Sequence, residues 1–180
     1  MFRAFVHRLG RAGRAVLALA LLAVADGCNR SAPAAPPRTV GDWFTIRVGG
    51  QPVRLQVAVS EAEMARGLME RRDLAPDQGM LFVYREPQAL GFWMRDTPLP
   101  LDIGFFGRSG KLEEVHAMYP FDETPVRSRS DRVQFALEMN QGWFREHGLR
   151  PGAGLDLADL RAALEARGVP LQDYGLAPPP

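Results

Sequence analysis

The stretch "GFWMRDTPLPLDIGFF" (residues 91–106) combines apolar runs, prolines and charged residues within sixteen positions. An aromatic run ends in Arg95 and Asp96, two prolines interrupt the chain, and a second apolar run begins around Asp102. Short apolar runs separated by turn residues are typical of short buried strands. The charged residues between the two runs therefore either hold a turn together or line a site.

Similar short runs extend in both directions from this stretch. Residues 43–48 and 53–59 alternate apolar and polar side chains around the turn signal "GGQP" (49–52), and this pattern predicts a hairpin. The last predicted strand, at 133–140, alternates cleanly as well. The other strands are predicted at 80–84, 92–95, 101–106 and 111–118.

Helical signals are fewer than strand signals. Ser60 and Glu63 have the spacing of a capping box, which predicts a helix over 61–72. Gly67 lies inside this predicted helix, where glycine costs roughly 1 kcal/mol relative to alanine. The close approach of a neighbouring strand would explain a glycine at this position.

Many short strands with one or two short helices predict an α+β domain over residues 42–155. We expect it to be compact, with a mainly antiparallel, barrel-like sheet. A helical turn is expected around 142–147, and leucines at helical spacing predict an extra C-terminal helix at 156–168. A flexible tail is expected over 169–180.

The amino terminus is typical of a targeting signal. A basic segment precedes an apolar run, "AVLALALLAVA" (15–25), which is shorter than the about 20 residues of a bilayer-spanning helix. The following "ADGC" (25–28) resembles the cleavage box of bacterial lipoproteins. We therefore expect residues 1–27 to be a signal peptide and Cys28 to be lipidated. The alternative is a secretory peptide that is cleaved elsewhere, with Cys28 incidental.

The proline- and alanine-rich segment 28–41 is expected to tether the domain to the membrane. Asn29 does not resemble the aspartate that retains many lipoproteins at the inner membrane. The periplasmic side of the cell envelope is therefore the expected location, at the outer membrane rather than the inner.

Charge and cysteine content argue against several classes of partner and cofactor. Removing residues 1–27 removes four arginines and Asp26, which leaves 18 basic and 20 acidic residues. A chain so close to neutrality has no general electrostatic reason to bind nucleic acid. The single cysteine cannot form an intramolecular disulfide, and no glycine-rich phosphate loop occurs. We expect no cofactor and no metal site.

Four motifs occur in order along the chain. They are "RGLMERRDLAPDQGMLFVY" (66–84), "FWMRDTPLPLDIGFF" (92–106), "VHAMYP" (115–120) and "FALEMNQGWFREHGLRPG" (135–152). Together they resemble the bacterial and archaeal family called domain of unknown function 192. This resemblance implies a compact, β-rich α+β domain that is often secreted or attached to a membrane. It implies no biochemical activity and no set of catalytic residues.

Strand parity suggests a candidate site in the opening stretch. If 92–95 is extended, Trp93 and Arg95 share one face. A pocket formed by Arg95, Asp102 and Glu138 and walled by Trp93 is then geometrically possible. The structural alternative is that Asp96 caps a turn and Arg95 neutralises a buried acid. The candidate ligand-binding residues are Trp93, Arg95, Asp96, Asp102, Glu138 and Asn140.

Three classes of function remain open from the sequence. The first is non-enzymatic recognition of a small polar ligand or an envelope partner. The second is a periplasmic hydrolase that uses Asp102 or Glu138 as acid or base. The third is a structural factor in envelope assembly. A deep cavity with converging polar groups would favour binding or catalysis.

Two further features have a structural interpretation and a functional one. Soft methionine sulfur can bind Cu(I), but most of these methionines stand at apolar positions, where methionine usually fills a core. The arginines in the loop 119–131 and just after it could meet an anionic ligand, but neighbouring acids make a solvated, mixed-charge loop the preferred interpretation. The methionines are Met64, Met69, Met80, Met94, Met118 and Met139, and the arginines are Arg127, Arg129 and Arg132.

Overall fold

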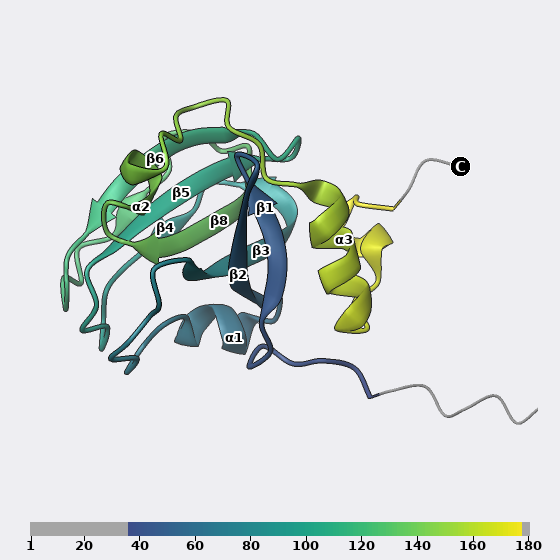
Figure 1. Cartoon of the computed structure of the whole chain (residues 1–180), viewed down its shortest axis with the longest axis horizontal. Helices are drawn as coiled ribbons and strands as arrows, with labels where there is room; N and C mark the ends of the chain where they lie inside the picture. The colour runs from purple at the N-terminus through teal and green to yellow at the C-terminus, as the bar shows by residue number, and fades with distance from the viewer. Residues whose placement is uncertain (1–35, 178–180) are drawn as a thin grey trace, which may run out of the picture. The chain divides into compact units, whose positions relative to one another are not determined.

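The computed structural model describes residues 36–177. The predicted signal peptide, Cys28 and the tether up to residue 35 lie outside the described residues. Figure 1 shows the described elements. In chain order they are β1 (Phe44–Val48), β2 (Gln51–Ala58), α1 (Glu61–Arg66), β3 (Gln78–Gln88), β4 (Gly91–Phe92), β5 (Leu101–Gly107), β6 (Leu112–Met118), β7 (Val126–Arg127), β8 (Val133–Asn140), α2 (Trp143–Glu146), α3 (Leu157–Ala166) and the 3-10 helix η1 (Leu171–Tyr174).

The described residues form the predicted α+β fold around a six-stranded sheet of order β1-β2-β3-β8-β5-β6. The predicted hairpin is confirmed, since β1 and β2 pair antiparallel. All other pairs in this sheet are also antiparallel except β2 and β3, which are parallel because α1 crosses over between them. The sheet is therefore mixed. A separate two-stranded sheet pairs β4 with β7.

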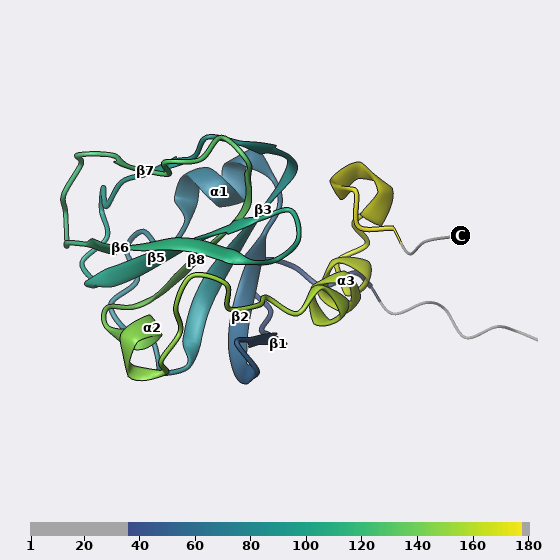
Figure 2. The same ribbon diagram turned by 90° about the horizontal axis from the view of Figure 1, so that it is seen from above.

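Strand β8 lies inside this sheet and has the predicted bounds, 133–140. It pairs with β3 on one edge and β5 on the other. A hydrophobic core covers each face: one contains Phe82, Phe92 and Phe105, and the other contains Phe135 and Leu160. Figure 2 shows α1 and β7 on one side of the sheet and α2 on the other. Side chains of β8 are thus buried whichever way they point.

The sheet is not closed by strand pairing, because β1 and β6 remain its two edges. The segment 152–156 nevertheless bonds to both edges. The amide of Asp156 donates to the carbonyl of Arg47 in β1 (2.8 Å), and the amide of Gly152 donates to the carbonyl of Leu112 in β6 (2.8 Å). The domain is barrel-like in this limited sense.

Two elements are shorter than the sequence pattern predicts. Helix α1 ends at Arg66 instead of residue 72, because Gly67 has a positive φ of 49° and caps the helix. The strand predicted at 92–95 reduces to β4, which ends at Phe92. Beyond it the chain turns: the amide of Thr97 donates to the carbonyl of Met94 (3.1 Å), and Asp96 has a φ of 50°.

The C-terminal region corrects the expectation of a flexible tail over 169–180. Helix α3 occurs where predicted, and the side chain of Asp156 caps its first amides. After it, η1 and Leu176 return to the core, where Leu171 and Tyr174 are also buried. The sequence did not predict this packing, because the segment after α3 is short and its apolar residues are separated by polar ones. Residues 178–180 lie outside the described range.

An ion pair joins the end of α3 to the start of α1. The guanidinium of Arg167 bonds to the carboxylate of Glu63 and to the carbonyl of Val57. Glu63 also accepts the amides of Val59 (2.9 Å) and Ser60 (3.0 Å), which completes the predicted capping box. Burial alone would raise the pKa of Glu63, but the bonds from Arg167 and the two amides lower it from 4.5 to about 2.

We expect Arg167→Met to lower the free energy of unfolding by about 3 kcal/mol, because it leaves the Glu63 carboxylate partly buried without its cation. The matched control is Arg66→Met, which removes an exposed pair with Glu70 and should cost less than about 1 kcal/mol. Urea denaturation measures both. Because the pKa of Glu63 is lowered, its stabilisation is present above pH 4.5 and is lost as the pH falls toward 2. Equal losses in the two variants would contradict this assignment.

Candidate functional site

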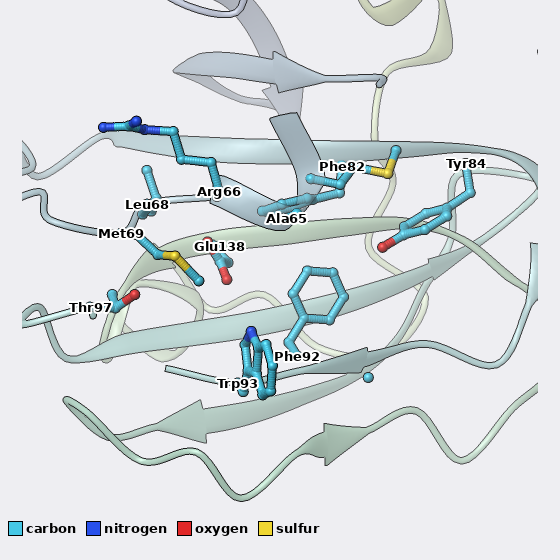
Figure 3. Close-up of a pocket in the computed structure, with 13 residues that line it drawn as sticks. Ala65, Arg66, Leu68, Met69, Phe82, Tyr84, Phe92, Trp93, Thr97 and Glu138 are labelled. Atoms are coloured by element: carbon cyan, nitrogen blue, oxygen red, sulfur yellow. The ribbon is translucent and has the colours of Figure 1, made fainter. Parts of the chain in front are cut away.

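A cavity of about 330 Å³ lies between α1 and the sheet, on the face that carries β4. Its walls combine aromatic rings, thioethers and a few polar groups, as Figure 3 shows. Such a mixture is typical of small-molecule sites. The lining residues are Met64, Ala65, Arg66, Gly67, Leu68, Met69, Phe82, Tyr84, Gly91, Phe92, Trp93, Thr97 and Glu138.

Among residues 36–177, Glu138 supplies the only carboxyl group that lines this cavity. It lies in the middle of β8, where its strand partners are Met80 and Ile103, and its side chain is 5% exposed. Its Oε2 atom is buried and has no hydrogen-bond partner among the described residues. Burial raises the pKa of Glu138 from 4.5 to about 8. In the folded protein without a ligand, the Glu138 carboxyl group is therefore mostly protonated at neutral pH.

Tyr84 and Trp93 also contribute polar groups to the lining of this cavity. In Figure 3 the hydroxyl group of Tyr84 points into the cavity. Burial, with a smaller effect of the Glu138 charge, raises the pKa of Tyr84 to about 12, so the phenol stays neutral. Trp93 is 43% exposed at the wall of the cavity. The guanidinium of Arg95 stacks 3.9 Å from the centre of the indole ring and so covers one of its faces.

The structure separates the predicted group of Arg95, Asp102 and Glu138. Arg95 pairs with Glu123 (2.8 Å) instead of either predicted acid, and it does not line the cavity. The predicted parity is kept, since Phe92 and Met94 are buried whereas Trp93 and Arg95 are exposed and stack on each other. Strand β4 nevertheless ends at Phe92, and Arg95 lies in the turn that follows, where its partner is Glu123. Asp96 lies exposed in this turn with a positive φ of 50°. That its side chain caps the turn stays a prediction.

Asp102 lies on the opposite face of the sheet from Glu138. The β5–β8 register places Asp102 opposite Met139, whereas Ile103 is opposite Glu138. The Oδ2 atom of Asp102 accepts the amide of Gly142 (2.8 Å) just before α2. Burial raises the pKa of Asp102, and the Gly142 amide opposes this shift. Asp102 and Glu138 therefore cannot act together on one substrate.

Asn140 is the last predicted site residue, and it also lies outside the cavity. Its side-chain amide donates to the carbonyls of Leu74 (3.2 Å) and Ala75 (2.9 Å), which fixes the loop before β3. Of the six predicted residues, the cavity thus brings together Trp93 and Glu138. Sequence reasoning missed Tyr84, which it treated as a strand end. The motif that contains Gly67 and Met69 could have indicated that α1 and the residues after it line the cavity.

The methionines and the arginine-rich loop mostly follow their structural interpretation. Met80, Met94, Met118 and Met139 are buried in the two cores, whereas Met64 and Met69 line the cavity. Within residues 36–177, no group of three or more His, Cys, Asp or Glu side chains could hold a metal ion. In the predicted loop 119–131, Val126 and Arg127 form β7. The amide of Arg129 donates to Glu114 (2.7 Å).

No helix in the described part of the chain has the length and apolar character that crossing a membrane would require.

The fold and cavity define a small α+β domain whose open, mixed sheet buries one acid against a ligand-sized space. Residues 44–157 match the model of the DUF192 family, described as an uncharacterised ACR, and the chain belongs to this family. A comparison with curated proteins gave no match.

Two solved structures resemble this chain. One, from Novosphingobium aromaticivorans, is a protein of unknown function that is 32% identical, with a TM-score of 0.62 over 68% of this chain and 94% of the other. The second, from Sinorhizobium meliloti 1021, is described as a candidate transcription regulator. It is 33% identical, with a TM-score of 0.60 over 63% of this chain and 92% of the other.

We expect Glu138→Gln to remove a pH dependence of stability. Because burial raises the pKa of Glu138, protonation stabilises the native chain fully below pH 4.5, and this stabilisation is lost as the pH rises through about 8. The free energy of unfolding should therefore fall by roughly 1.4 kcal/mol per pH unit between these limits. Glu138→Gln should show a flatter profile in urea denaturation from about pH 6 to 8.

The matched control for this series is Asp102→Asn, which changes a buried carboxyl group on the opposite face of the sheet. It should keep the slope of the parent chain over the same pH range. If Glu138→Gln keeps the pH dependence of the parent chain's free energy of unfolding, the pKa of Glu138 is not raised.

Proposed function

We propose that this chain is an envelope-anchored binding protein that takes a small, partly apolar ligand into the cavity beside Glu138. One observation carries the proposal: Glu138 lines a ligand-sized cavity, and its carboxyl group has one buried oxygen without a hydrogen-bond partner among the described residues. A buried polar group usually has a hydrogen-bond partner, and leaving it without one costs about 1–3 kcal/mol. A ligand that bonds to the Glu138 carboxyl group would offset part of that cost.

The chemistry of the walls supports binding more than catalysis. Phe92 and Trp93 offer flat apolar surface, and Met64 and Met69 offer adaptable side chains. The hydroxyl group of Thr97 already donates to the carbonyl of Arg95 (3.0 Å). The two acids lie on opposite faces of the sheet, so a hydrolase could use Asp102 or Glu138 but not both on one substrate. A hydrolase that uses one of them as acid or base stays a prediction.

Occlusion of the cavity tests the binding function. Ala65 is exposed on α1 and lines the cavity, so Ala65→Phe should fill the entrance and abolish binding without disturbing the cores. Ala62→Phe, exposed on the same helix but outside the lining, is the matched control. We expect at least a tenfold loss of affinity for Ala65→Phe alone, about 1.4 kcal/mol.

The readout is a screen of fragment-sized compounds by fluorine NMR of the full chain labelled with 5-fluorotryptophan. The chain has three tryptophans, of which Trp93 lines the cavity while Trp43 and Trp143 serve as internal references. Fragments that bind in the cavity should shift the Trp93 resonance selectively. The proposal fails if no fragment does so, or if Ala65→Phe retains the shifts.

The envelope location has a separate test. If Cys28 is the lipidation site, cells given labelled palmitate should incorporate the label, and globomycin should block processing of the chain. Cys28→Ala should lose the label and move out of the membrane fraction, whereas the neighbouring Ser31→Ala should retain both. Absence of label on the parent chain would end the lipoprotein proposal and leave the cavity proposal intact.

A further inference from the structure

The Glu138 carboxyl group has no cationic partner among the described residues. We infer that the ligand of the cavity is a small organic ammonium ion, whose nitrogen pairs with the Glu138 carboxylate while its apolar part lies against Phe92 and Trp93. This inference rests on the proposed binding function and names the class of ligand.

The elements around Glu138 supply no counter-charge. Strand β3 contributes Tyr84, which is neutral, and β5 and β4 contribute Ile103 and Phe92, which are apolar. Helix α1 contributes Arg66, but its guanidinium points away from the cavity in Figure 3 and pairs with Glu70 (3.2 Å). Among the described residues, no cation therefore neutralises Glu138.

The guanidinium of Arg95, which lies beside the cavity-lining Trp93, is also engaged. Arg95 stacks on Trp93 and is held by two bonds from its guanidinium to the Oε2 atom of Glu123, at 2.8 and 3.1 Å. Arg66 and Arg95 are thus each paired with a glutamate of the protein. Trp93 keeps its other ring face for the apolar part of a ligand.

Buried charges in proteins are normally paired, and an unpaired one carries a large desolvation cost. In the ligand-free protein Glu138 avoids this cost by keeping its proton, so its charged form needs a cationic partner from outside the chain. Metal ions take several donor groups, whereas this wall offers a single carboxylate among apolar and aromatic groups. One carboxylate with aromatic walls suits an organic ammonium ion, which needs one anionic partner and apolar cover.

The same arrangement couples the binding of an ammonium ion to the release of a proton from Glu138. The carboxyl group of the free protein has a raised pKa and is mostly protonated at pH 7, so it must lose its proton to pair with an ammonium ion. Binding should release about one proton, and affinity should rise about tenfold per pH unit up to pH 8. A neutral ligand that bonds to the protonated acid would show the opposite trend.

The experiment compares two probes of nearly equal shape, benzylamine and benzyl alcohol, by titration calorimetry of the full chain. We expect benzylamine to bind at least tenfold more tightly than the alcohol at pH 8. Its affinity should increase from pH 6 to 8, and its binding enthalpy should vary with the buffer because a proton is released. Glu138→Gln should abolish the preference for the amine, and Asp102→Asn should retain it.

Two results would overturn the inference and can be told apart. If benzyl alcohol binds as well as the amine, with no rise in affinity toward pH 8 and with loss in Ala65→Phe, the cavity binds a neutral ligand and the proposed function survives. If neither probe binds, the ammonium class is wrong. The fluorine screen then decides the function, which fails as well if no fragment shifts the Trp93 resonance.

Discussion

The burial of β8 on both faces is the constraint on which the rest of this structure depends. With a strand on each edge and a core on each side, β8 must bury every side chain that it presents. Gly79 allows β3 to lie close enough, since a Cβ at that position would come within 2.3 Å of the Glu138 carbonyl. Six apolar or amide side chains of β8 are buried at little cost and Asn140 is half-buried, whereas Glu138 is an acid that is buried as well.

The position of Glu138 explains both its altered acidity and its access to a cavity. Its side chain points toward α1, where the short helix and the turn after β4 leave space above the sheet. On the other face, the carboxyl group of Asp102 has an amide partner in Gly142 and serves the loop into α2. The two buried acids thus differ in their surroundings: Asp102 accepts an amide of the protein, whereas one oxygen of Glu138 has no partner among the described residues.

The sequence predicted the strands with clear alternation and the motif order, and it pointed to Glu138 and Trp93 as residues of interest. It could not predict that Asp102 and Glu138 face opposite ways, because facing depends on the register between β5 and β8. The strand predicted at 92–95 ends at Phe92, and Asp96 adopts a positive φ in the turn that follows. Tyr84 entered the site through the pairing of β3, which no local pattern records.

The bonds of segment 152–156 to both edge strands have a consequence for the chain as it leaves the ribosome. Unpaired strand edges are templates for contact between chains. The segment follows all eight described strands, so a nascent chain has both edges of its sheet free until this late stretch emerges. Once this segment is made, it can bond to both edge strands. A product truncated before residue 152 would keep both strand edges unpaired and open to contact with other chains.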